Sequence, residues 1–312
     1  MKSRGGKNST TFSPSGFPRD VSVREHDGFL RVTGFRLYHR VFEPESYTNT
    51  VVALHGGPGA HHEYLLPLAD LAKRGYRVVF LDQLGCGRSE RSPDPSVYNV
   101  GHNVEEVEGV REALGLGRIH LVGSSYGGLL ALAYAIQHQD RLKSLVTIGG
   151  LADVPYTVSE MQRLIGGLSK ASRAAIKKYG GLGYFNDPKY LKAVDEFYHR
   201  HVCRLPKWPP EVARVLTETN FDVYGRMNGP NEFTITGTIK DVNLTPRLPS
   251  IRVPTLVTGG RFDEVTPNVA RQIRDHIPGA RQVTFERSSH VPFWEERPAF
   301  MKEVAQFLDA HD

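Results

Sequence analysis

A short glycine-flanked turn near the middle of the 312-residue chain constrains the fold most strongly. Residues 123–127 read Gly-Ser-Ser-Tyr-Gly, with Ser125 at the centre of a G-x-S-x-G pattern. An apolar run at 119–122 precedes the turn, and a helix-forming run at 129–135 follows it. Glycine flanks let a strand turn sharply into a helix, because a Cβ at those positions would contact one or the other. We therefore predict a strand, a strained turn that exposes the Ser125 hydroxyl, and a helix.

A candidate acid and a candidate base follow later in the chain. An α/β-hydrolase places Ser, then Asp or Glu, then His in chain order, with the last two in loops after late strands. Residues 253–260 read as a buried strand, and Asp263 follows its end. A helix over 268–276 and a strand over 282–285 come next, and His290 follows that strand. We predict that Asp263 orients the imidazole and that His290 is the general base.

The oxyanion hole is expected to use two backbone N–H groups. A strand over 50–54 runs into residues 55–59, which read His-Gly-Gly-Pro-Gly. Glycine N–H groups in such a loop can approach a carbonyl oxygen closely. We predict that Gly57 supplies one donor and that Tyr126, at the start of the helix after the nucleophile, supplies the other. A plain Gly/Pro turn would not explain why this loop falls where the hydrolase mechanism needs it.

Strands and helices alternate between residues 50 and 150, which predicts a parallel sheet covered by helices on both faces. An alternating apolar pattern over 29–42, centred on Gly34, predicts a hairpin at the edge of this sheet. The remaining predicted strands lie at 77–81 and 145–148, and the predicted helices lie near 64–73 and 104–114.

The alternation stops between residues 151 and 246. Apolar residues recur there at helical spacing, around 158–168 and 191–198, and a further helix is predicted after Pro209-Pro210. We therefore predict an α/β fold with an α/β-hydrolase core at 21–150 and 247–312 and a helical cap at 151–246. Such a cap would close a small-substrate pocket over the strand ends. Residues 1–20 are polar and are predicted to be a flexible extension.

Composition excludes several functional classes. The net charge of +5 comes without a block of Lys and Arg, so nucleic-acid binding is not favoured. No segment approaches the roughly 18 apolar residues of a membrane span, and residues 1–7 do not begin a signal peptide. The two cysteines, Cys86 and Cys203, predict no disulfide framework and favour a reducing cytoplasm.

No metal or other cofactor is expected. His55, His61 and His62 have no Cys or carboxylate partner at a metal-binding spacing, so loop hydrogen bonding is the favoured interpretation of these histidines.

Several motifs resemble one family of hydrolases. Residues 55–59, residues 82–89 (Asp-Gln-Leu-Gly-Cys-Gly-Arg-Ser) and residues 123–128 resemble those of the proline iminopeptidases. Residues 227–238 and 262–267 are similar to the archaeal tricorn-interacting-factor branch of that family. The resemblance runs from about Val32 to Leu308. It implies an α/β-hydrolase with a helical cap that removes N-terminal residues, often proline, from short peptides.

The resemblance also implies how the substrate is selected. An exopeptidase must distinguish a free α-ammonium from an internal amide, and buried carboxylates can do so electrostatically. Glu264 follows Asp263 and is therefore expected beside the active site, whereas the family motif implies that Glu232 binds the substrate N-terminus. Tyr224 is a candidate for lining the prolyl pocket. The tricorn-interacting branch further implies a functional link to a large upstream protease.

The leading hypothesis is a serine aminopeptidase that works through an acyl-enzyme. An amidase acting on amino-acid amides such as prolinamide would use the same acyl pocket and stays open. A non-catalytic binding module is disfavoured by the complete triad. A carboxylesterase would leave Glu232 and Glu264 without a role. The chain departs from many bacterial members by having Tyr126, where they have Trp, after the nucleophile.

Overall fold

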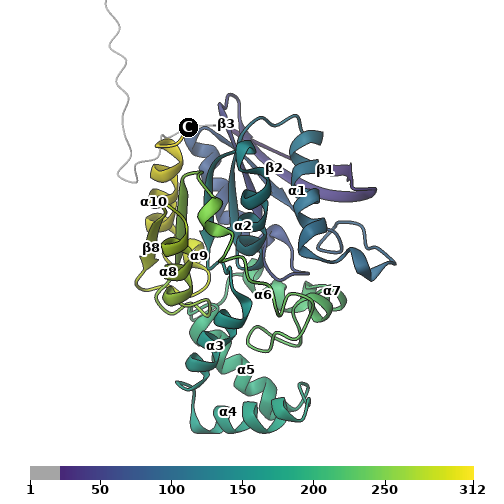
Figure 1. The fold of residues 1–312 in the computed structure, drawn as a ribbon, viewed down its shortest axis with the longest axis vertical. Helices are drawn as coiled ribbons and strands as arrows, with labels where there is room; N and C mark the ends of the chain where they lie inside the picture. Colours follow the sequence, from purple (N-terminus) through teal and green to yellow (C-terminus); the bar gives the residue numbers. More distant parts are fainter. Residues whose placement is uncertain (1–21) are drawn as a thin grey trace, which may run out of the picture.

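A single eight-stranded sheet carries the architecture of residues 22–312, the part of the chain that the computed structural model describes (Figure 1). The predicted extension at 1–20 lies outside these residues. The strands are β1 (Val23–Val32), β2 (Phe35–Pro44), β3 (Asn49–Leu54), β4 (Tyr76–Leu81), β5 (Ile119–Ser124), β6 (Leu142–Ile148), β7 (Thr255–Gly260) and β8 (Arg281–Phe285). Their order across the sheet is β1-β2-β4-β3-β5-β6-β7-β8. β2 pairs antiparallel with β1 and with β4, and all other neighbours are parallel.

The predicted edge hairpin is confirmed. β1 and β2 are joined by the two residues Thr33 and Gly34, which have φ values of 51° and 90°. Positive φ at both turn residues matches the twist of the flanking strands, and glycine adopts this conformation without steric cost.

The helices are α1 (Val100–Ala113), α2 (Tyr126–His138), α3 (Val154–Ile165), α4 (Lys170–Ala175), α5 (Pro188–His201), α6 (Pro210–Glu218), α7 (Phe221–Met227), α8 (Pro267–His276), α9 (Pro292–Glu295) and α10 (Arg297–Asp309). The 3₁₀ helices are η1 (His62–Arg74), η2 (Pro95–Val97), η3 (Gln139–Arg141) and η5 (Leu248–Ser250), and η4 (Ile176–Gly180) is a π-helix. Two predicted core helices differ in detail. The helix expected near 64–73 is the 3₁₀ helix η1, which contains Pro67, and proline has no N–H for an α-helical bond. α2 starts at Tyr126, three residues before the predicted apolar run.

Two apolar layers cover the two faces of the sheet. Successive residues of a strand point to opposite faces. Val52 and Leu54 of β3 accordingly join the layer that contains α1, α2 and α8, while Val51 and Ala53 join the layer that contains η1, α9 and α10. Because helices cover both faces, all six residues of β3 are buried. This burial explains why the parallel strands read as continuous apolar runs and confirms the predicted α/β architecture.

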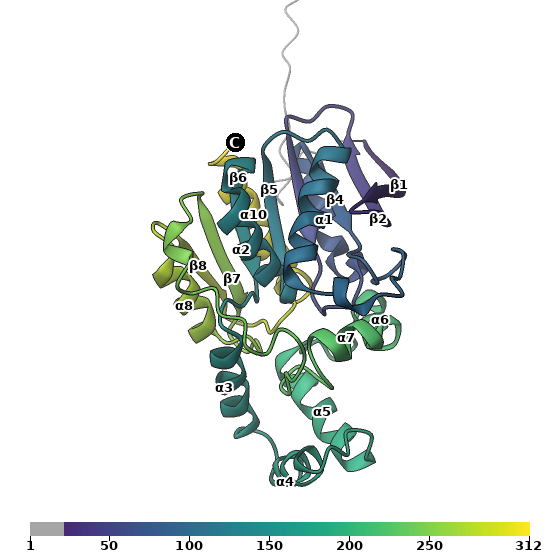
Figure 2. The same cartoon turned by 45° about the vertical axis from the view of Figure 1, so that its right-hand side comes forward.

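The segment between β6 and β7 is helical. The helices α3, α5 and α6 lie where apolar spacing predicted them, and α4, η4 and α7 were not predicted. In both views α3, α4 and α5 extend away from one end of the sheet, while α6 and α7 lie close to that end (Figures 1 and 2). Among residues 22–312, none of the helices combines the length and the apolar character that a membrane crossing requires.

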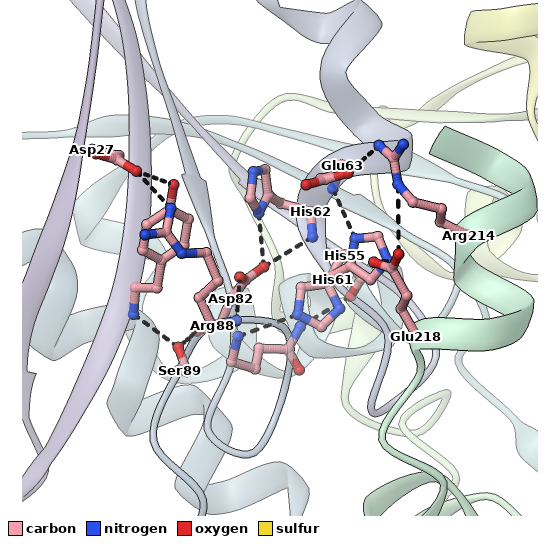
Figure 3. A network of polar contacts seen from close by, with 12 residues as sticks. Asp27, His55, His61, His62, Glu63, Asp82, Arg88, Ser89, Arg214 and Glu218 are labelled. Carbon is pink, nitrogen blue, oxygen red and sulfur yellow. Dashed lines mark hydrogen bonds and ion pairs between the residues drawn. The ribbon is translucent and has the colours of Figure 1, made fainter. Parts of the chain in front are cut away.

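Polar contacts join α6 to the core. Arg214 of α6 donates to Glu63, and Glu218 of the same helix lies 3.7 Å from Nε2 of His61 (Figure 3). Both core residues belong to the loop and the 3₁₀ helix that follow β3. The Arg214–Glu63 ion pair therefore adds to the apolar packing that places α6 over this end of the sheet.

Candidate active site

The turn after β5 presents Ser125 in a strained conformation. Ser125 has φ 56° and ψ −123°, an unusual combination for a residue with a side chain, and such strain costs about 1–3 kcal/mol. The surrounding backbone holds it in place, because the Ser125 N–H donates to the Ile148 carbonyl at 2.9 Å and its carbonyl accepts from the Gly128 N–H at 2.8 Å. The Ser125 side chain lines a pocket at this end of the sheet.

The flanking glycines allow this turn. A Cβ on Gly123 would lie 2.0 Å from the Gly127 carbonyl oxygen, and one on Gly127 would lie 2.3 Å from the Leu54 carbonyl oxygen. Neither backbone group can move away, since both belong to the sheet or to the helix that follows it. The structure thus supports the predicted reason for glycine at these two positions.

Asp263 and His290 meet beside Ser125. Asp263 lies in the loop after β7 and His290 lies in the loop after β8. Nδ1 of His290 is 2.7 Å from Oδ1 of Asp263, and this oxygen also accepts the Val265 N–H at 2.8 Å. Ser125 and His290 line the same pocket, although no hydrogen bond joins their side chains within residues 22–312. Such contacts often tighten only when substrate binds.

The charge of His290 depends on its carboxylate neighbours. Burial disfavours the imidazolium, but the charge and hydrogen bond of Asp263, together with Glu264 and Glu232, outweigh it. These carboxylates raise the pKa of His290 to about 10.

Gly149 makes room for the acid and the base. It has φ 52°, and a Cβ there would lie 2.7 Å from Nδ1 of His290 and 2.8 Å from Oδ2 of Asp263. We expect Gly149→Ala to lower kcat about 10- to 100-fold, because the imidazole must shift and small displacements of catalytic groups cost about that much. The matched control is Gly115→Ala, since Gly115 has φ 62° and open space around it. Steady-state kinetics of the folded variants test this, and equal losses in both variants would contradict it.

The predicted oxyanion donors come from two different segments next to Ser125. Gly57 lines the pocket, and Tyr126 opens α2, where the first N–H groups lack helical partners. Within residues 22–312, neither N–H donates to another backbone group. The hydroxyl of Tyr64 accepts the Gly56 N–H at 2.7 Å, and a Cβ on Gly56 would lie 2.7 Å from that of Ser125. Tyr64 therefore holds the donor loop against the nucleophile.

The Tyr126 side chain is anchored by a buried relay that the sequence analysis missed. Its hydroxyl donates to Oδ1 of Asn103 at 2.6 Å, and Asn103 donates to Glu106 at 3.1 Å. Glu106 also accepts the Leu84 N–H at 3.0 Å, and burial raises the pKa of Glu106 to about 7. The relay ties the start of α2 to α1 and to the loop after β4. Its sequence signal is the i, i+3 spacing of Asn103 and Glu106 on the apolar face of a helix.

Two carboxylates share the pocket with Ser125 and His290. Glu264 is only 2% exposed, and its Oε1 lies 3.8 Å from Nε2 of His290. Glu232 is partly buried and accepts the Tyr224 hydroxyl at 2.8 Å. Burial raises the pKa of both carboxyl groups, and the charge of Glu232 adds to the effect on Glu264. The structure thus brings every predicted site residue together around one pocket or directly behind it.

The rest of the pocket is mostly apolar and comes from the core and the inserted helices. Its empty volume is about 790 Å³, including the open mouth. The lining residues that sequence analysis did not predict include Tyr64, Tyr198, Val202, Trp208, Val212, Val215, Leu216, Phe221 and Val291. Most of them belong to α5, α6 and α7 or to adjoining loops, so no local sequence pattern could have assembled them.

The histidines near the Gly57 loop form hydrogen bonds that connect this loop with the loop after β4 (Figure 3). His62 and its backbone N–H contact Oδ1 of the buried Asp82 at 2.8 and 2.9 Å, and His55 accepts the Gln83 N–H at 3.2 Å. The prediction of loop hydrogen bonding is confirmed. No cluster of three metal-ligating side chains occurs within the described range 22–312.

Comparison with known proteins finds relatives that match most of the chain. The alpha/beta hydrolase fold family matches residues 49–297. A proline iminopeptidase of Thermoplasma volcanium is 46% identical over 288 residues, 92% of this chain and 97% of the relative. One of Saccharolobus solfataricus is 45% identical over 293 residues, 93% of this chain and 94% of the relative. The crystal structure of the Mycobacterium smegmatis proline iminopeptidase matches with a TM-score of 0.86 at 34% identity, covering 92% of this chain and 98% of the other.

Proposed function

Because this chain belongs to the proline iminopeptidases, a family with the α/β-hydrolase fold, we propose that it releases N-terminal residues from short peptides through an acyl-enzyme on Ser125. The enzyme is a hydrolase of the aminopeptidase class with a preference for proline, and the two archaeal relatives confirm the predicted family. The assignment of individual residues is our proposal.

The reaction follows from the geometry of the triad. Ser125 attacks the carbonyl of the N-terminal residue while Nε2 of His290 takes its proton and then gives it to the leaving amine. Asp263 holds the imidazole through Nδ1, at 2.7 Å, and stabilises its positive charge. The N–H groups of Gly57 and Tyr126 stabilise the oxyanion. Water then attacks the acyl-enzyme by the same route and frees the amino acid.

One observation carries the choice of an aminopeptidase: two carboxyl groups, Glu232 and Glu264, line the same pocket as the nucleophile. A buried carboxylate is stable only when a cation or hydrogen-bond donors compensate it. A substrate α-ammonium supplies that cation and places the first peptide bond near Ser125. A neutral ester or an N-blocked peptide does not.

We also propose that residues 151–246 act as a cap domain on a core formed by 21–150 and 247–312. The helices α3 to α7 enter between β6 and β7, and several of them contribute the apolar pocket wall. A pocket of this kind admits a peptide end but not a folded chain.

A substrate panel tests peptidase against amidase activity. The relatives do not favour the amidase alternative. The apolar wall gives a second residue additional buried contact that the NH₂ of prolinamide lacks. We therefore expect kcat/KM for prolyl dipeptides and tripeptides to exceed that for prolinamide by about tenfold or more. The measurement is amino-acid release under identical conditions, and faster turnover of prolinamide would support the amidase instead.

Two further proposals concern the location of the enzyme in the cell and the source of its peptide substrates. We propose a cytoplasmic location, which is supported by the free, buried state of Cys86 and Cys203. We also propose that its peptides come from a large upstream protease, since a pocket of this size requires substrates that are already short.

A further inference from the structure

The pocket floor carries more acidic than basic groups. Among the described residues that line the pocket, two are carboxyl groups, one is an imidazole and none is Lys or Arg. Asp263 adds a third carboxyl group behind the imidazole, 2.7 Å from Nδ1 of His290. The other polar groups that face this cluster include the hydroxyls of Tyr198 and Tyr224. Behind the pocket, His201 and Glu295 also interact with Asp263, and burial lowers the pKa of His201. Without substrate, the cation that lines the pocket together with Glu232 and Glu264 is therefore a protonated His290.

Glu264 lies next to Nε2, the ring nitrogen of His290 that takes part in the reaction. Its Oε1 is 3.8 Å from Nε2, the atom that must accept the proton of Ser125. Its Oε2 is buried and has no hydrogen-bond partner within residues 22–312. Glu232, the second carboxyl group, accepts only the Tyr224 hydroxyl in this part of the chain. Nε2 thus lies beside a buried, incompletely compensated carboxyl group.

The charges around Glu264 and His290 favour the binding of a proton by this pair. Burial and the neighbouring Glu232 raise the pKa of Glu264, while the three carboxyl groups outweigh burial and raise the pKa of His290. Both pKa values are shifted upward, so the charges around this pair favour the binding of a proton. A proton on Nε2 prevents His290 from acting as a base toward Ser125.

We propose that the empty site keeps a proton on Nε2 of His290, with the carboxyl group of Glu264 3.8 Å away, and that the α-ammonium of the substrate displaces this proton to solvent. The inference rests on the proposed function, because it takes Glu232 and Glu264 as the ammonium site. One positive charge enters the pocket and one proton leaves to bulk water, so the charge of the site is unchanged. Selection for a free N-terminus then acts on kcat as well as on binding, since only a free amine produces a neutral His290.

Calorimetry of an inactive variant measures this exchange. Ser125→Ala is titrated with a prolyl arylamide at about pH 6.5, below the usual α-amino pKa of about 7.7–8.0, in two buffers of different ionisation enthalpy. We expect release of about one proton per bound ligand. Adding Glu264→Gln should reduce the release to less than half. Adding Glu286→Gln, which changes an exposed carboxylate after β8, should leave it unchanged.

A second readout covers the case in which the Glu264→Gln variant binds too weakly. The pH titration of the His290 Cε1–H signal is followed by NMR in Ser125→Ala, with and without saturating prolyl arylamide. We expect its midpoint to fall by about one pH unit or more on binding. Binding without proton release and with an unchanged midpoint would overturn the inference and leave the proposed function intact. Failure of the arylamide to bind, together with no turnover by the unmodified enzyme, would contradict the proposed function itself.

Discussion

Ser125→Ala is expected to lower kcat for a prolyl arylamide by about 10⁴–10⁶-fold, with little change in KM. The variant loses the nucleophile, so no acyl-enzyme forms, while the carboxyl groups that hold the ammonium stay in place. A fluorophosphonate should label the unmodified enzyme once per chain, at Ser125. Steady-state kinetics and peptide mapping of the labelled residue provide the two measurements.

The adjacent serine supplies the matched control. Ser124 is fully buried, and it is not among the residues that line the pocket. Ser124→Ala should therefore keep turnover within a few fold of the unmodified enzyme. Labelling at Ser124, or near-normal turnover of Ser125→Ala, would show that the nucleophile is assigned incorrectly.

The triad could be predicted from the sequence because each member follows a strand. Ser125 comes directly after β5, and Asp263 and His290 lie in the loops after β7 and β8. Parallel strands place their carboxyl ends at one edge of the sheet. Short apolar runs were sufficient to locate these strands. Glycines at 123 and 127 then indicated which strand end carried the nucleophile.

Other parts of the site depend on packing that no local pattern encodes. Asn103 and Glu106 did not stand out in the sequence as site residues, yet they are 3% and 0% exposed and form hydrogen bonds with Tyr126 and Leu84. The pocket wall combines residues of the inserted helices with Tyr64 of η1, far apart in the sequence. The helices α4 and α7 were missed because segments of six and seven residues show too little periodicity.

Blocking the substrate amine should produce the second large effect. If Glu232 and Glu264 bind the ammonium, an N-acetyl group removes the cation that these two carboxyl groups bind. Loss of one partner of such a pair costs about 2–5 kcal/mol, which corresponds to about 30-fold to several thousand-fold in kcat/KM. N-acetylprolyl arylamide should therefore be a poor substrate by this margin, although its scissile bond is identical.

The carboxyl group of Glu232 should account for part of that discrimination. Glu232→Gln keeps the acceptor for the Tyr224 hydroxyl but removes the negative charge. It should weaken turnover of the free-amine substrate far more than turnover of the acetylated one. The exposed carboxylate of Glu286 provides the control, because Glu286→Gln should leave both rates unchanged.

Whether the enzyme selects a free N-terminus is tested most directly by a two-by-two comparison of kcat/KM. The unmodified enzyme and Glu232→Gln are each assayed on prolyl arylamide and on N-acetylprolyl arylamide. The account predicts a preference of about 30-fold to several thousand-fold for the free amine in the unmodified enzyme, and a much smaller preference in Glu232→Gln. Equal turnover of the two substrates by the unmodified enzyme would contradict the aminopeptidase assignment and indicate a broad amidase or esterase.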